Sequence, residues 1–247
     1  MTRTQRQIEE HRTGEACIEV RDAAARPCVG VSVSVEQETH EFEFGCVPPN
    51  LDAASETDRQ RCHDRLGEVF NRIVPAGTLT PGATRLDVPN AVHLGRHGQE
   101  LDRLAAGGER LEVWVRGECV GLGPDADDRA AAERAAALYT LCFAHPEVRA
   151  IVWDGFWDGE EGSQGTGLLR RDFSPKPAFR YLLKLIETVW HSRSNSVTDA
   201  DGRFRFRGFF GDYRVVARAG PVATTALFSF RDGVEARFQL QLNEHKR

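Results

Sequence analysis

The chain has 247 residues, 40% of them hydrophobic, which is enough for one large domain or for a medium domain and a small one. Its 32 basic and 37 acidic residues are mixed along the sequence and give a net charge of -5, so charge offers no case for nucleic acid or an anionic membrane as partner. No apolar stretch has the length of a signal-peptide core or of a membrane span, and we expect a cytoplasmic protein.

The spacing of the cysteines indicates no disulfide framework. They stand at positions 17, 28, 46, 62, 119 and 142, with no CxxC pair among them. This scatter predicts free, mostly buried thiols rather than disulfides or a zinc site. We predict neither a metal nor any other cofactor.

Residues 16–47 show the period-two alternation of β-strands. Apolar and polar residues alternate at 17–20, 31–35 and 42–44, and turn-forming residues occupy 22–27. The pattern predicts an N-terminal β-hairpin extension over residues 1–40, followed by a further strand at 44–47.

Helical patterns and apolar runs alternate through the middle of the chain. Strands are predicted at 84–88, 111–116 and 150–153, and helices at 52–71, 99–106, 125–143 and 178–189. Ser55 or Thr57 is the expected cap of the first helix, and Pro175 and Pro177 set the start of the last one. This alternation favours the α/β class.

The stretch 150–181 holds the densest polar chemistry. An apolar run ends at Trp153, and acidic and aromatic residues follow at Asp154, Trp157, Asp158, Glu160 and Glu161. Five glycines between 155 and 167 predict a loop whose backbone can approach a ligand. A strand whose carboxyl end carries acids and tryptophans is the unit from which α/β barrels build active sites.

From residue 197 onward the composition changes. Four alternating strands are predicted at 203–210, 213–220, 224–230 and 236–242, after an acidic turn at 199–202. The turn lacks the glutamate and the helices of an EF-hand, which favours a plain hairpin turn over a calcium site. The pattern predicts a C-terminal antiparallel β domain over 193–247.

Several of these segments together resemble glycoside hydrolase family 10, the xylanase family. The resemblance rests on WDGFWDG at 153–159, GLL at 167–169, Asp172 and PKPAF at 175–179, and it extends to HEFEFG at 40–45, FNRIVP at 70–75, LDRLAAGGERLEVWV at 101–115 and TDADGRFRFRGFFGDY at 198–213. It implies a (β/α) barrel whose active site uses two glutamates, one as nucleophile and one as acid/base.

The sequence departs from that family in its middle. Only residues 76–111 separate the segments that resemble the second and seventh barrel strands, so strands three to six cannot all be present. We therefore expect an incomplete or remodelled (β/α) barrel derived from a TIM-barrel glycosidase over 41–192, which the C-terminal antiparallel β region could complete.

Both inherited glutamates are missing. By the resemblance, the nucleophile falls on Gly117 and the acid/base residue on Ala91, which makes conventional xylanase activity improbable. Glu118 lies one residue from the nucleophile position, and it could replace that group only if a bulge re-aimed its side chain.

The remaining ionisable groups supply the candidate site. The catalytic candidates are Asp154, Glu118, His93 and His97, and the candidates for substrate binding are Trp114, Trp153, Trp157, Asp158, Asn90 and Arg96. Two alternatives stay open for Asp154, an acid/base role in an aromatic pocket or an outward-facing salt bridge. The spacing of His93 and His97 suits zinc only on a helix, and no third ligand accompanies them.

Three functions follow from these residues. The leading expectation is a small-molecule enzyme that uses acid/base catalysis on an acetal or oxocarbenium-type centre, such as a spiroacetal-forming cyclase of polyketide or other specialised metabolism. The alternatives are a carbohydrate-binding or regulatory pseudoenzyme and a glycoside hydrolase with relocated carboxylates. Each takes a small-molecule ligand, and a homodimer is left open.

Overall fold

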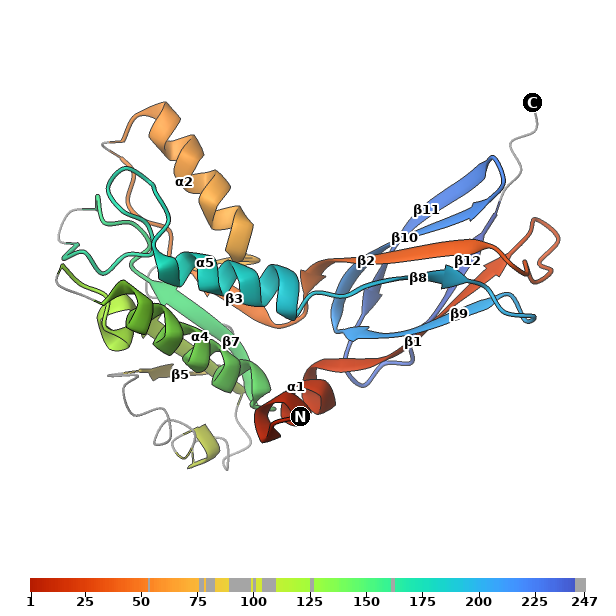
Figure 1. Cartoon of the computed structure of the whole chain (residues 1–247), viewed down its shortest axis with the longest axis horizontal. Helices are drawn as coiled ribbons and strands as arrows, with labels where there is room; N and C mark the ends of the chain where they lie inside the picture. Colours follow the sequence, from red (N-terminus) through yellow and green to blue (C-terminus); the bar gives the residue numbers. More distant parts are fainter. Residues whose placement is uncertain are drawn as a thin grey trace. The chain divides into compact units, whose positions relative to one another are not determined.

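The computed structural model describes residues 1–52, 54–75, 78, 83–88, 99, 101–103, 110–124, 127–160 and 163–242. The chain divides into two units (Figure 1). Unit 1 comprises Met1–Ile8 and Phe42–Val189, and unit 2 comprises Glu9–Glu41 and Trp190–Arg247. The predicted N-terminal and C-terminal β regions therefore belong to one unit, instead of forming two separate parts beside a central domain.

Unit 1 is built on a parallel sheet of five strands in the order β4-β3-β7-β6-β5. The strands are β3 (Glu43–Cys46), β4 (Arg72–Ile73), β5 (Ala83–Asp87), β6 (Arg110–Arg116) and β7 (Val148–Asp154). Residues 150–153 of β7 and 111–115 of β6 are buried, as expected for strands covered on both faces. The apolar runs of the sequence thus predicted β6 and β7, two of the three inner strands, to within a few residues.

The helices of unit 1 begin at residues that the sequence favours for that position. They are α2 (Glu56–Val69), α4 (Asp128–Ala144) and α5 (Pro177–Lys184), which continues as the π-helical η3 (Leu185–Val189). The Ser55 side chain accepts a hydrogen bond from the Asp58 amide, and Pro177 is the first residue of α5. Tyr139 of α4 lies against Phe44 of β3 and Trp153 of β7, so α4 covers one face of the sheet.

The predicted barrel is wrong. Among the described residues the parallel sheet is open, because β4 and β5 form its two edges and do not pair with each other. Five strands are too few to close around a filled interior. The C-terminal strands do not complete the sheet either, because they pair among themselves and with β1 and β2.

Unit 2 is a sandwich of two sheets. One sheet has the order β12-β1-β9 and the other the order β11-β10-β2-β8. The strands are β1 (Thr13–Arg21), β2 (Ser32–His40), β8 (Arg193–Val197), β9 (Arg203–Phe209), β10 (Gly211–Ala219), β11 (Val222–Phe230) and β12 (Arg237–Gln241), and the helix α1 (Arg3–Arg12) precedes β1.

No N-terminal hairpin forms. β1 pairs with β9 and β12, whereas β2 pairs with β8 and β10, so the two strands lie in opposite sheets. The turn residues between them connect the two layers. Alternation identified each strand, but a local pattern cannot distinguish a hairpin from a crossing between sheets.

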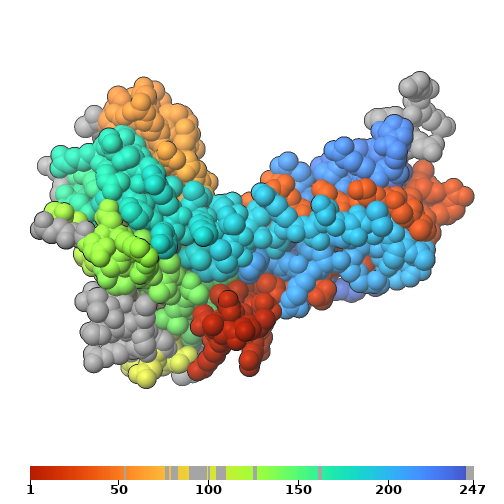
Figure 2. Space-filling view, viewed as in Figure 1, coloured from red at the N-terminus to blue at the C-terminus, as the bar shows by residue number. Residues whose placement is uncertain are grey.

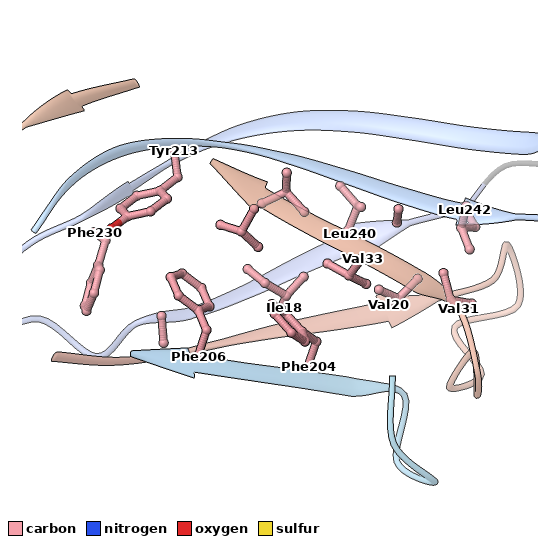
Figure 3. Packing of buried hydrophobic residues seen from close by; sticks show 14 residues of the cluster. Ile18, Val20, Val31, Val33, Phe204, Phe206, Tyr213, Phe230, Leu240 and Leu242 are labelled. Atoms are coloured by element: carbon pink, nitrogen blue, oxygen red, sulfur yellow. The ribbon is translucent and has the colours of Figure 1, made fainter. Parts of the chain in front are cut away.

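The core of unit 2 lies between its two sheets. Ile18 and Val20 of β1 and Phe204 and Phe206 of β9 point toward Val33 of β2 and the strands of its sheet (Figure 3). All of these side chains are buried, and they occupy alternate positions of their strands. The interior thus joins residues from both ends of the sequence.

Tyr213 fixes one end of this core. Its ring is fully buried, its hydroxyl donates a hydrogen bond to the Phe209 carbonyl at 2.5 Å, and burial raises its pKa to about 12. The neutral phenol is thus the form that the folded chain favours. An unfolded tyrosine has a pKa of about 10. The stabilisation from this group is fully present below the unfolded pKa. It is lost as the pH rises from the unfolded pKa through the folded pKa.

We expect Tyr213→Phe to lower the free energy of unfolding by about 1 kcal/mol at neutral pH, because the hydrogen bond is lost. Between about pH 10 and 12 the wild-type chain should lose stability more steeply than this variant. Denaturant titrations at a series of pH values measure both effects. Tyr181→Phe, at a side chain that is 40% exposed, is the control, and an equal pH slope in both variants would contradict the assignment.

Candidate functional site

The candidate site lies at the carboxyl edge of the parallel sheet, where Arg116 ends β6 and Asp154 ends β7. The two residues are paired in register, and Arg116 Nε donates to Asp154 Oδ2 at 3.0 Å. The side chains are 59% and 28% exposed, respectively. Asp154 raises the pKa of Arg116, with smaller contributions from Glu118 and Asp87. Of the two alternatives left by the sequence, the structure therefore has the salt bridge.

Acidic groups surround this ion pair. Glu118 is exposed on the short helix η2 (Gly117–Val120), directly after Arg116. Asp87 ends β5 and forms an ion pair with Arg85, whose guanidinium group lies 3.9 Å from the ring centre of Trp114. The edge thus presents fixed charges of both signs, which suits hydrogen bonding to a polar ligand.

Two of the predicted ligand-stacking tryptophans are core residues. Trp114 is 3% exposed and donates through Nε1 to Glu112 at 2.8 Å. Trp153 is fully buried and donates through Nε1 to the Gly155 carbonyl at 3.0 Å. Neither ring has a face free for a ligand, which corrects the prediction for both. Apolar strands need large side chains on both faces, and this packing requirement explains the two tryptophans.

Trp157 anchors the loop that follows β7. Its ring stacks on Phe173 with the ring centres 4.6 Å apart, and Nε1 donates to the Arg171 carbonyl at 3.3 Å. A Cβ atom on Gly159 would come within 2.0 Å of the same ring, so only glycine fits there. Phe173 adopts φ 63°, a conformation rare for an aromatic residue. The stack holds two distant parts of the loop together.

Asp158 also has a structural role instead of the predicted contact with substrate. Its carboxylate lies 2.8 Å from Lys176 Nζ and accepts the Gly167 amide at 2.8 Å. Lys176 Nζ also donates to the Gly165 carbonyl, and both charged side chains are almost completely buried. A buried charge pair with additional hydrogen bonds is costly to break. The pair therefore closes the loop between residues 158 and 176.

The closed loop covers Gly117, the residue on which the resemblance to family 10 places the nucleophile. A Cβ atom at Gly117 would lie 1.7 Å from the Thr166 carbonyl oxygen, so the backbones of η2 and the loop are in direct contact. No side chain larger than the hydrogen atom of glycine fits between them. Residue 117 is thus enclosed by backbone, a feature that the sequence could not show.

A second charged group lies deeper on the same face of the sheet. Glu112 is 1% exposed and accepts hydrogen bonds from Trp114 and from Arg72 Nη1, the latter at 3.1 Å. Arg72 also forms an ion pair with Glu43. None of these residues is among the predicted site residues, although a glutamate inside the apolar run 111–115 was a usable signal.

The remaining predicted site residues, His93, His97, Asn90 and Arg96, lie outside the described residues. Within the described part of the chain no group of three His, Cys, Asp or Glu side chains is arranged to hold a metal ion. The six cysteines are free, and burial raises the pKa of Cys62 to about 11. None of the described helices has both the length and the apolar character needed to span a membrane.

Comparison with known structures gives a partial likeness to xylanases. Xylanase 10B from Thermotoga petrophila RKU-1, solved in complex with xylobiose, is 21% identical, with a TM-score of 0.33 over 44% of this chain and 35% of that chain. Native xylanase 10B from Thermotoga maritima is 20% identical, with a TM-score of 0.32 over 44% of this chain and 36% of that chain. No family model matches the chain.

Comparison with curated sequences gives the anti-sigma-I factor RsgI6 of Acetivibrio thermocellus. The two sequences are 32% identical over 116 residues, which is 47% of this chain. The match spans only 14% of the length of that relative.

We expect Gly117→Ala to lower the free energy of unfolding by about 1–3 kcal/mol, because the new methyl group would force η2 and the loop apart. Gly123→Ala is the matched control, since a Cβ there meets nothing within 4 Å. Urea unfolding followed by circular dichroism compares the two variants. Equal stability of both would show that the contact with Thr166 is not tight.

Lys176→Met should destabilise the chain by about 3–5 kcal/mol, since it leaves the buried Asp158 carboxylate without its cation. Arg129→Met removes an exposed pair with Glu133 and should leave the stability nearly unchanged, because water and salt screen such a pair. Thermal unfolding of both variants tests the difference. A Lys176→Met chain as stable as the control would refute the loop-closing role of the ion pair.

Proposed function

We propose that the chain is a carbohydrate-binding pseudoenzyme, which holds a sugar ligand at the carboxyl edge of its parallel sheet without cleaving it. The contact between Gly117 and the Thr166 carbonyl carries the proposal. Retaining hydrolysis needs two carboxylates about 5–5.5 Å apart on either side of the scissile bond. A nucleophile at residue 117 has no room, and Ala91 supplies no carboxylate at the other inherited position.

The ion pair of Arg116 and Asp154 suits binding better than turnover. Guanidinium and carboxylate groups held in a fixed pair can donate to and accept from neighbouring sugar hydroxyls, and both side chains are partly exposed. Exposed Glu118 and Asp87 add acceptors nearby. The arginine contact also engages the carboxylate that the expected acid/base reaction would use.

The curated relative is in keeping with a non-catalytic role. An anti-sigma factor is, by its name, a regulatory protein, and the match covers 47% of this chain. A module that reports a bound sugar to a regulatory partner needs affinity but no chemistry. The motifs shared with family 10 are the reason for choosing a carbohydrate as ligand.

The alternative proposal is the cyclase expected from the sequence. It needs one group that donates a proton and one that accepts it within reach of a single ligand. Asp154 and Glu118 lie at the same edge, but Asp154 is bound by Arg116. The described residues therefore favour the pseudoenzyme.

Calorimetric titration with xylo-oligosaccharides tests the proposal, together with a chromogenic xyloside assay. We expect binding without turnover. Arg116→Met should weaken binding at least about tenfold, because it removes a charged donor and releases Asp154 from its position. Arg129→Met, at an arginine on α4 that is also exposed, should leave the affinity unchanged. Xyloside hydrolysis, or binding that Arg116→Met leaves intact, would contradict the proposal.

A further inference from the structure

The described strands of unit 2 form two sheets with four edges, and three of these edges are protected against pairing with another strand. β9 carries Arg203, Arg205 and Arg207 at alternate positions. β8 and β12 are each five residues long and begin with an arginine. Short strands and charged side chains are the usual means by which proteins block their sheet edges.

The fourth edge, β11, has neither protection. This strand is nine residues long, VATTALFSF, with no charged residue and no proline. Among the described strands it pairs with β10 alone. Because ladder hydrogen bonds alternate in direction, alternate residues of β11 point their amide and carbonyl groups away from β10. A long, uncharged edge of this kind can accept a further strand.

Apolar side chains of β11 are exposed or only partly buried on both faces of the strand. On the outer face Leu227 is 74% exposed, a high value for a leucine within a strand. On the inner face Val222, Ala226 and Phe228 pack against the core but are only partly buried. Figure 2 shows atoms in the blue of residues 211–230, which form β10 and β11, on the surface of unit 2 in this view. A strand added here would cover apolar surface on both faces.

We propose that β11 is the dimerisation strand of the protein, which pairs antiparallel with β11 of a second copy to join two four-stranded sheets into one. A two-fold axis at Ala226 places Val222 opposite Phe230 of the partner subunit and Leu227 opposite Thr225 of the partner subunit. Leu227 then lies diagonal to its own copy, within reach of a long side chain.

A second copy fits this edge because β11 is complementary to itself. Like charges directly opposite each other destabilise a strand pair, and a strand without charges avoids them in any register. The same backbone amide and carbonyl groups of β11 point away from β10 in both copies. One symmetric contact therefore gives hydrogen-bond partners to both strands. A copy of β9 would instead place arginines opposite arginines.

The oligomeric state of the full chain tests the proposal. Sedimentation equilibrium over a range of protein concentrations should give a dimer for the wild type. Leu227→Lys should raise the dimer dissociation constant at least about tenfold, because two lysines would meet diagonally across the axis and lose the contact of the two leucines. Circular dichroism establishes that the variant is folded, and Thr225→Lys replaces it if it is not.

Val197→Lys is the matched control. Val197 is an exposed aliphatic residue, 58% accessible, on β8 at the opposite edge of the same sheet. This variant should dimerise like the wild type. The proposal is overturned if the wild type is monomeric at all concentrations, if the folded lysine variant of β11 keeps the wild-type dissociation constant, or if Val197→Lys weakens the dimer equally.

Discussion

A buried ion pair between Asp158 and Lys176 determines the form of the candidate site. It ties the start of the segment after β7 to its end, and the Trp157 and Phe173 stack fixes the interior of the same segment. With both contacts made, the Thr166 carbonyl lies against Gly117. The closure of the loop over residue 117 therefore requires a glycine there. A glutamate side chain at this position would not fit beneath the loop.

Residues that resemble parts of an enzyme can be kept for packing alone. Trp153, Trp157, Asp158 and Lys176 all lie in the segment with the strongest resemblance to family 10, and all of them form contacts within unit 1. The resemblance therefore reflects the way this segment folds at least as much as any chemistry. The Arg116 and Asp154 pair differs from these residues in being partly exposed to solvent.

The sequence predicted the positions of helices and strands well, but it predicted poorly which strands pair with each other. Apolar periodicity located β6, β7 and α4, and the cap at Ser55 is one of the two residues predicted for it, because these signals are local. The closure of the sheet and the partners of β1 and β2 depend on contacts between distant segments, which alternation does not encode. The salt bridge of Asp154 was open for the same reason, since Arg116 becomes its neighbour only through the register of β6 and β7.

Unit 2 is built from two sequence segments, one before and one after residues 42–189. β1 lies between β9 and β12, and β2 lies between β8 and β10, so each early strand has late strands on both sides. A ribosome makes β1 and β2 first and must then make residues 42–189 before any of their partners appears. Unit 1 can complete its sheet during that interval, whereas the early strands wait with their edges unpaired. Folding of the sandwich is thereby a late event in synthesis, and the two early strands are the segments that a chaperone would need to shield.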